Sequence, residues 1–307
     1  MSYSFLKESK LFIVYGGNKY RIYTTTALSF SQTFAEDSYP VKTLHDQSKM
    51  VSGTTITKAN PAQFSFETPL TLEKDESIVM DLLTDIVTTV DSGITTQQLK
   101  SFDMYVQTGS STFKTAGCVV TSADFAFNPK GQFKVAYSGQ GTKLSRVGNE
   151  SYTIPGSLQS ESSTRTPLQV YPEVTVDSLN MTSIIAATVQ IQTAVDWTPF
   201  ETLHNSLAVT NSSNAMFPSA YTVTNRIVSG AITQYQTDNN NTQFDDFSTN
   251  SNITITANQM NGTDFWKITL NPAMYTARMQ TADVYTQVYD FRSTGNTALA
   301  TQISEYS

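Results

Sequence analysis

The chain has 307 residues, a formal net charge of −7 and a sequence pI near 4.8, and 15% of its residues are charged. This length can bury a sizeable core and suits two domains of ordinary size. The acidic balance argues against a protein that grips nucleic acid phosphates, although not against one that nucleic acid passes without being held. With 39% hydrophobic residues the chain is predicted to fold.

The same inventory argues against two further classes of protein. The single cysteine, Cys118, lies in an apolar run, so a disulfide framework is excluded and a buried thiol is expected. The first residues lack the apolar core of a signal peptide, and the longest apolar run, residues 184–189, is too short to span a bilayer. We therefore expect no membrane-spanning segment.

The first half opens with strand signals. Residues 11–15 and 19–24 flank a Gly-Gly-Asn turn, which predicts a hairpin. Residues 28–34 and 62–67 then alternate apolar with small polar side chains, which predicts two half-buried strands. The long polar segment between them is typical of a functional loop. The polar faces of the two strands carry Ser29, Ser31, Gln63, Ser65 and Glu67.

Residues 73–87 form the one helix candidate. Their first turn is acidic, and apolar residues recur at Ile78, Leu82 and Ile86, so one stripe is predicted to cover a sheet. A strand near residues 104–107 follows. Residues 117–127 and 132–138 are then predicted to pair across the turn sequence Asn-Pro-Lys-Gly.

Apolar periodicity is lost over residues 145–167, where Ser, Gly, Pro and charged residues prevail. We therefore predict a first domain over residues 1–150, a linker over 151–166 and a second domain over 167–307. The second half shows strand patterns but no clear counterpart of the helix. Its most regular strand, residues 185–195, has a polar face of Thr188, Gln190 and Gln192.

A ten-residue motif occurs once in each half. Residues 37–46 read DSYPVKTLHD and residues 196–205 read DWTPFETLHN, and the two histidines lie 204 − 45 = 159 residues apart. Because both copies follow a strand-like run, we predict two copies of one domain. The residues predicted to form projecting loops are Asp37, Tyr39, Pro40, Leu44 and His45 in the first copy, and Asp196, Trp197, Pro199, Phe200, Leu203 and His204 in the second.

The sequence offers little support for catalysis. Neither histidine has a neighbouring nucleophile, and His45 precedes an aspartate whereas His204 precedes an asparagine. Residues 139–143 lack the spacing of a phosphate loop, and residues 238–249 lack the glycine and glutamate of a calcium loop. We therefore expect no enzyme, no metal site and no cofactor.

The order of these elements resembles the tail tube proteins of long-tailed bacteriophages, of the type with two tube domains per chain. The resemblance is carried by the strands around Phe30 and Phe64, the long loop between them, the helix, and the hairpin that ends in Tyr137-Ser138-Gly139. It implies an all-β fold with one flanking helix, built as two tandem β-sandwich domains.

The resemblance also implies an assembly. Three chains would form a pseudo-hexameric ring, and stacked rings would form a tube through which viral DNA passes without specific binding. The long loops would contact the next ring, and other tail proteins would be partners. The protein would be made in the host cytoplasm and reside in the virion. The predicted polar strand faces contain no Lys or Arg, which suits a channel that does not hold phosphate.

Two other classes stay open. A surface adhesin or carbohydrate-binding β-sandwich would use an aromatic such as Trp197 on an exposed platform. A β-sandwich hydrolase would need a carboxylate pair, and the sequence does not single one out.

Overall fold

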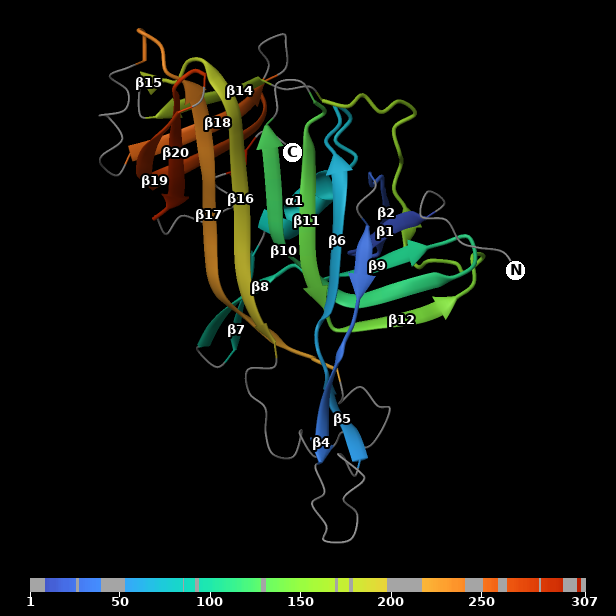
Figure 1. Ribbon diagram of the computed structural model, residues 1–307. Coiled ribbons are helices and arrows are strands. Elements are labelled where there is room, and N and C mark those ends of the chain that lie inside the picture. The colour runs from blue at the N-terminus through green and yellow to red at the C-terminus, as the bar shows by residue number, and fades with distance from the viewer. Residues whose placement is uncertain are drawn as a thin grey trace.

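Strands dominate the structure. The computed structural model describes residues 9–25, 28–39, 53–84, 86–91, 94–127, 131–168, 171–176, 179–197, 217–240, 251–258, 264–281, 283–294 and 303–304. These residues form strands β1 to β21 and one helix, α1, which confirms the predicted all-β class with one helix (Figure 1). No helix within the described ranges is long and apolar enough to cross a membrane.

Eight strands pair side by side in one antiparallel sheet, here called the long sheet. Their order is β3-β6-β11-β10-β16-β17-β20-β19, and several of them stand upright in Figure 1. The pairing of β10 with β16 makes the sheet continuous from the first half of the chain to the second. The strands are β3 (Ser29–Ser31), β6 (Ala62–Pro69), β10 (Thr112–Phe127), β11 (Lys134–Gly141), β16 (Ile184–Trp197), β17 (Tyr221–Tyr235), β19 (Asp264–Gln280) and β20 (Thr286–Ser293).

Two of these strands also belong to a second layer. The first part of β10 pairs with β9 and β12, and β9 continues to β1 and β2. Gly117, with a φ of 55°, lies where β10 changes from one sheet to the other. The first part of β19 likewise pairs with β18, which pairs with β14. The remaining bounds are β1 (Lys10–Tyr15), β2 (Asn18–Ile22), β9 (Phe102–Gln107), β12 (Lys143–Gly148), β13 (Ser157–Leu158), β14 (Tyr171–Val176), β15 (Leu179–Asn180), β18 (Ser251–Asn258) and β21 (Ile303–Ser304).

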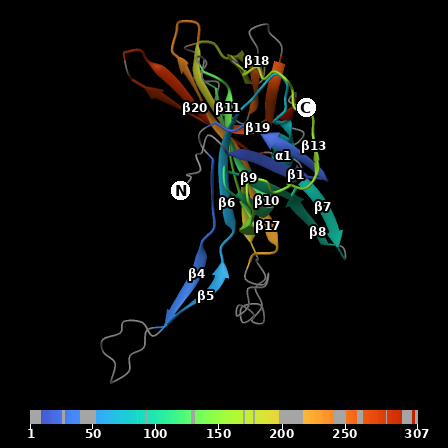
Figure 2. The same cartoon turned by 90° about the vertical axis from the view of Figure 1, so that its right-hand side faces the viewer.

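Between the layers lies one continuous buried core. The predicted alternation is confirmed, because Phe64, Phe66 and Ile191 are buried while their polar neighbours face outward. Trp266 from the second half stacks on Phe125 from the first half, with ring centroids 4.8 Å apart. The core therefore crosses the joint between β10 and β16. Helix α1 lies on the same side of the long sheet as this core (Figure 2).

The helix is shorter than predicted. It spans Ser77–Thr84, and the chain then forms the hairpin of β7 (Ile86–Asp91) and β8 (Ile94–Leu99). The β-branched run Ile-Val-Thr-Thr-Val favours a strand over the last turn of a helix. The guanidinium of Arg226, on β17, donates to the carbonyls of Leu83 and Thr84 and so caps the helix end. No helix is present in the described residues of the second half.

The segment predicted as a linker is tied to the first half along its length. The backbone N–H of Leu72 donates to the carbonyl of Thr166 at 3.1 Å, and the guanidinium carbon of Arg165 lies 3.4 Å from the ring centroid of Tyr23. Arg165 also contacts Asp75 and the buried Glu76, each at 3.2 Å. These contacts hold the segment as an ordered strap. The boundaries at residues 150 and 167 stay a prediction.

One hairpin projects from the body. It is formed by β4 (Phe34–Tyr39) and β5 (Gly53–Ala59), which continue the directions of β3 and β6. Figure 2 shows it leaving the sheet away from the side that carries α1. The strands predicted at residues 28–34 and 62–67 correspond to β3, the start of β4 and β6, whereas residues 53–59, predicted as part of the long polar loop, form β5.

Gly230 lies where a side chain would not fit. A Cβ atom at this position would lie 2.1 Å from the carbonyl oxygen of Thr188 and 2.5 Å from the ring of Phe291. The ring of Phe291 thus covers the glycine on the core side of the sheet. Because one contact is with backbone, the strand itself would have to move to admit a methyl group.

We predict that Gly230→Ala lowers the free energy of unfolding by roughly 1–3 kcal/mol, the usual cost of overpacking a core. Urea unfolding followed by fluorescence measures it. Gly131→Ala is the matched control, because nothing lies within 4 Å of its added Cβ. Equal stability of the two variants would contradict the close packing around Gly230.

Candidate functional site: the exposed face of the long sheet

The face of the long sheet opposite the core carries every side chain that was predicted to line a channel. Strands β3, β6 and β16 present them, and each is exposed or half-buried. They are Ser29, Ser31, Gln63, Ser65, Glu67, Thr188, Gln190 and Gln192. The sequence assigned them to separate strands, and the strand order places them on one surface, here called the polar face.

One row of small polar residues crosses five strands of this face. Ser29 pairs with Ser65, Ser65 with Ser138, Ser138 with Ser122, and Ser122 with Gln192. Hydroxyls bond across the row, at 2.8 Å between Ser29 and Ser65 and at 2.7 Å between Ser122 and Ser138. Adjacent strands thus satisfy one another's polar groups.

The polar face also carries cations that sequence reasoning missed. The predicted strand faces contain none, but other strands of the long sheet contribute Lys134, Arg278 and Arg292. The alternation of Phe133, Val135 and Tyr137 already assigned Lys134 to the opposite face of its strand. What the sequence could not show is that this strand lies beside β6.

Two of these cations are held by carboxylates on adjacent strands. Lys134 lies 3.2 Å from Glu67, and Arg278 lies 3.1 Å from Asp290. The hydroxyl of Thr25 donates to Glu67, and this bond, followed by the ammonium of Lys134, lowers the pKa of Glu67. Glu67 therefore keeps its negative charge to a lower pH than an ordinary glutamate.

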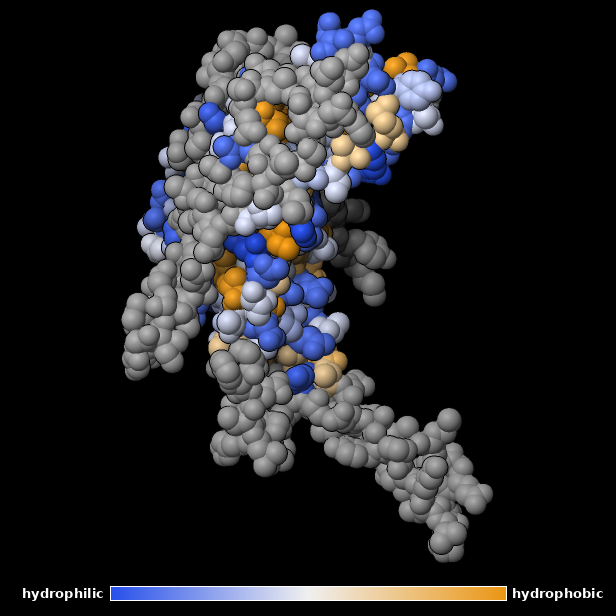
Figure 3. Space-filling view, turned by 90° about the vertical axis from the view of Figure 1, so that its left-hand side faces the viewer, coloured by the Kyte–Doolittle hydropathy of each residue, from blue (hydrophilic) through white to orange (hydrophobic). Residues whose placement is uncertain are grey.

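Small side chains leave a depression in part of the polar face. Around the joint of β10 and β16, Ala126, Thr188 and Ala231 line a depression of about 680 Å³, whose lining also includes Asp124 and Asp290. On the left-hand side of the molecule, hydrophobic side chains lie singly or in small groups among hydrophilic ones (Figure 3). The described part of that side therefore shows no large contiguous apolar patch.

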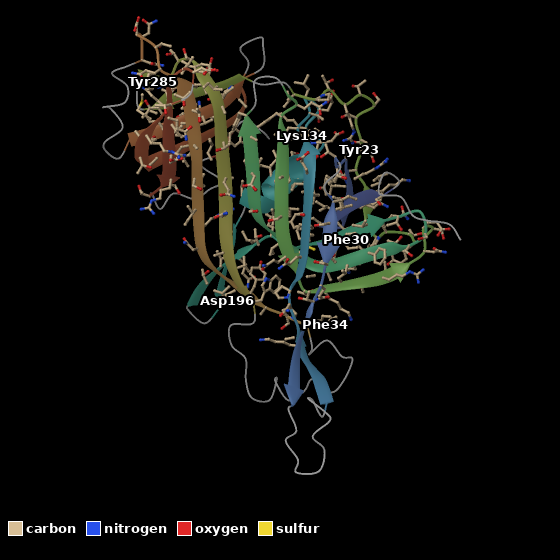
Figure 4. The ribbon with its side chains drawn as sticks, in the orientation of Figure 1. Tyr23, Phe30, Phe34, Lys134, Asp196 and Tyr285 are labelled. Carbon is tan, nitrogen blue, oxygen red and sulfur yellow. The ribbon has the colours of Figure 1, made fainter. Side chains whose placement is uncertain are left out.

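The predicted loop residues are only partly described. Asp37 and Tyr39 lie in β4, and Asp196 and Trp197 end β16. Asp196 and Phe34 are close to the same lower end of the molecule in Figure 4. The residues outside the described ranges are Pro40, Leu44, His45, Pro199, Phe200, Leu203 and His204.

Trp197 already has partners within its own chain. Its Nε1 donates to Oε1 of Gln140 at 2.7 Å, and its ring lies 5.0 Å from that of Tyr221. The hydroxyl of Tyr221 donates to the carbonyl of Leu99 at 2.7 Å, and burial raises the pKa of this phenol to about 12. Trp197 thus fastens the end of β16 to β11 of the first half. Its predicted contact with a neighbouring ring stays a prediction.

Both long hairpins change register at matching positions. The β4–β5 ladder shifts between Ala35 and Glu36, and the β16–β17 ladder shifts between Ala194 and Val195. These sites differ by 194 − 35 = 159 residues, the spacing of the two sequence motifs. The bulges therefore lie at the same distance from the motif in both halves.

The described residues suggest no metal chemistry. Within their ranges, no group of three or more His, Cys, Asp or Glu side chains could hold a metal ion. Cys118 is buried without a disulfide partner, and burial raises the pKa of its thiol. The absence of a cofactor stays an expectation.

A continuous sheet with one apolar and one polar face defines the chain as a β-rich protein. The chain belongs to the Bacteriophage Baseplate Tube Protein Family, whose family model matches residues 1–301. The predicted resemblance is thereby confirmed at the level of a phage tube family, and the chain is a structural, tube-like component of the virion. A search of the curated proteins finds no match.

We predict that Trp197→Phe lowers the free energy of unfolding by about 0.5–1.5 kcal/mol, because it removes a hydrogen bond but keeps most of the packing. Combining it with Gln140→Met should cost less than the sum of the single changes, since both remove the same bond. Chemical denaturation measures the cycle. Tyr285→Phe, at an exposed ring, is the control and should be neutral. Strict additivity of Trp197→Phe and Gln140→Met would refute the bond.

Proposed function

We propose that the protein is a tail tube subunit of a long-tailed phage. Three chains form a pseudo-hexameric ring, and stacked rings form the channel through which viral DNA leaves the virion. The observation that carries this proposal is the polar face, one continuous surface that spans both halves of the chain.

The repeated strand order supports the ring. The first half contributes β3-β6-β11-β10 and the second contributes β16-β17-β20-β19, which is the same succession of a long hairpin followed by a second hairpin in reversed order. The matching register shifts add to the likeness. Two tandem tube-like domains per chain make a pseudo-hexamer from three chains.

The electrostatics of the polar face support passage of DNA without specific binding. A phosphate that approached Lys134 or Arg278 would compete with a carboxylate already in contact at 3.2 or 3.1 Å. Cations that are neutralised in this way release fewer counterions from DNA and hold it more weakly. The channel wall thus stays hydrated and binds DNA only weakly.

The long loops suit contacts between rings. The β4–β5 hairpin and the end of β16 lie at one end of the molecule (Figure 4), and both lead into the repeated motif. We propose that Leu44, Phe200 and Leu203 supply apolar contacts to the next ring, while His45 and His204 act as hydrogen-bonding loop residues. Other tail proteins would cap the stack, and synthesis would take place in the host cytoplasm.

The alternatives are less well supported. Trp197 is half-buried and bonded to Gln140, so it does not form the exposed aromatic platform of a carbohydrate-binding surface. Asp75 and Glu76 are neighbouring carboxylates, but both are bound by Arg165 in a cluster that holds the strap. They do not form the free carboxylate pair of a hydrolase.

Electron microscopy of the purified protein tests the assembly. We predict rings and tubes for the natural sequence, and rings without tubes for the double variant Leu44→Ser/Leu203→Ser, because the stacking contacts lose their apolar groups. A persistent monomer at high protein concentration would refute the proposed function. Tubes of normal length from the double variant would refute only the role of the loops.

A charge variant tests the channel. We predict that Glu67→Gln slows DNA delivery from particles that carry it, because each Lys134 loses its carboxylate partner and becomes available to phosphate. High salt should restore the rate by screening. Glu173→Gln, at an exposed side chain of β14, gives the same change in net charge away from the polar face and should behave as the natural protein. Equal rates for both variants would remove Glu67 from the channel wall.

A further inference from the structure

We infer that β19 of one chain pairs antiparallel with β3 of the next chain, with Thr276 directly opposite Thr33. The inference rests on the proposed ring and names the residues that close it. The partner is a second copy of this chain, because the chain contains a template for the same joint.

The long sheet ends in two strands with one side each open. In the described part of the chain, β3 pairs only with β6, and the last residues of β19, 276–280, pair only with β20. Such edges are ready to receive a strand from another chain. The outward side chains on them are polar, namely Ser29, Ser31, Thr276, Arg278 and Gln280.

The template is the joint between β10 and β16. In the repeated strand order, β10 is the fourth strand of the first half and β19 the fourth of the second. In the same way, β3 is the first strand in the order of the first half, and β16 is the first strand in the order of the second half. The joint of β10 with β16 is therefore the model for a joint of β19 with β3, with Ser122 opposite Gln192 and Phe127 opposite Ala187.

The register of the proposed joint follows from two rows of paired residues, one in each half, that occupy equivalent positions. Adding 159 to Ser29 gives Thr188, and the ladders carry each of these residues across its own four strands. The first row is Ser29, Ser65, Ser138 and Ser122, and the second is Thr188, Ala231, Asp290 and Thr276. Thr276 thus corresponds to Ser122.

The partner position follows from the same offset. Gln192 becomes residue 192 − 159 = 33, so Thr33 of the next chain faces Thr276. Antiparallel steps then place Ser31 opposite Arg278 and Ser29 opposite Gln280. Arg278 is the one charge among these pairs and already contacts Asp290, so no like charges oppose each other.

The geometry of the strand suits this pairing. The carbonyl of Thr33 accepts a hydrogen bond of 2.9 Å from the backbone N–H of Asn60, so its peptide groups point toward its own hairpin. Thr33 therefore occupies a non-hydrogen-bonded site of the new ladder, where opposite Cα atoms are about 4.5 Å apart. The backbone groups of Phe30 and Gln32 alternate with it and face the neighbour.

The register also sets the tilt of the strands, at a value with which a sheet can close into a barrel. Crossing the four strands of one half moves the row from Ser29 to Gln192, which is equivalent to Thr33, a shift of 33 − 29 = 4 residues. With about 3.3 Å per residue and about 4.8 Å between strands, this shift corresponds to a tilt of about 35°. Closed barrels have strand tilts of roughly 35–45°. The same shift at the joint between chains keeps the tilt constant around the ring.

Disulfide trapping in assembled rings tests the register. The variant Thr33→Cys/Thr276→Cys is assembled under reducing conditions, checked for rings by electron microscopy and then oxidised; buried Cys118 does not compete. We expect the single-chain band on a non-reducing gel to be replaced by bands of two and three chains. Ser122→Cys/Gln192→Cys, at the template joint, should link within one chain and give no multimers.

A displaced pair separates this register from a looser contact. Thr33→Cys/Arg278→Cys lies on the same face but two residues out of register and should form few links. Hydrogen exchange of the natural protein gives a second measurement, in which backbone amides of residues 28–33 and 276–280 should exchange more slowly in rings than in single chains. Intact rings that show neither links nor protection, or that link better through Arg278→Cys, would overturn the register and leave the proposed function standing. Absence of rings would overturn both.

Discussion

The pairing of β10 with β16 is the interaction on which the rest of the arrangement depends. It joins the fourth strand of the first half to the first strand of the second, so eight strands form one sheet. Separate halves would expose four sheet edges, whereas the joined chain leaves only those of β3 and β19 in the long sheet. Trp266 packs behind the joint against Phe125 and Phe127, and aromatic pairs of this kind contribute about 0.5–1.5 kcal/mol each beyond their buried area.

Once the sheet is continuous, strand geometry decides what each face can be. Alternate side chains must point to opposite faces, so a single aromatic core on one side forces a second surface of the same extent on the other. That second surface carries Ser, Thr, Gln and Ala, with charges set as cross-strand pairs such as Glu67 with Lys134. Exposed pairs of this kind add little stability. These pairs keep the electrostatic potential along the polar face close to neutral.

Much of this face could be predicted from the sequence. Alternation over residues 28–34, 62–67 and 185–195 assigned most inward and outward side chains correctly, because a period of two depends only on local strand geometry. Phe34, expected on the apolar face, is the exception and is exposed. The Gly-Gly-Asn turn is equally local, and Gly16 and Gly17 have φ values of 58° and 80°. Strand order was beyond reach, because the partners of β10 are decided by packing between residues far apart in the chain.

The differences between expectation and structure have the same origin. The helix was extended through Ile86 because the apolar spacing continues, but the end at Thr84 is capped by Arg226, 142 positions away. Residues 151–166 have the composition of a linker and stay a predicted boundary between domains, but the sequence does not show that Arg165 lies over Tyr23 and beside Glu76. The cations of the polar face were missed because β11, β19 and β20 had to be placed in the long sheet before their positions had meaning. In each case the deciding contact is tertiary.

A tandem chain changes the physics of the ring that we propose. Six separate domains would need five association steps before the ring closes, each with a loss of translational and rotational freedom. With two domains per chain, every second joint forms during folding, where the linked strands have a high effective concentration. The two kinds of joint are also free to diverge. The joint within the chain can rely on Trp266 and Trp197, whereas the edges between chains have to stay polar until they meet, because exposed apolar edges would pair indiscriminately. The polar character of β3 and the end of β19 is what this division of roles requires.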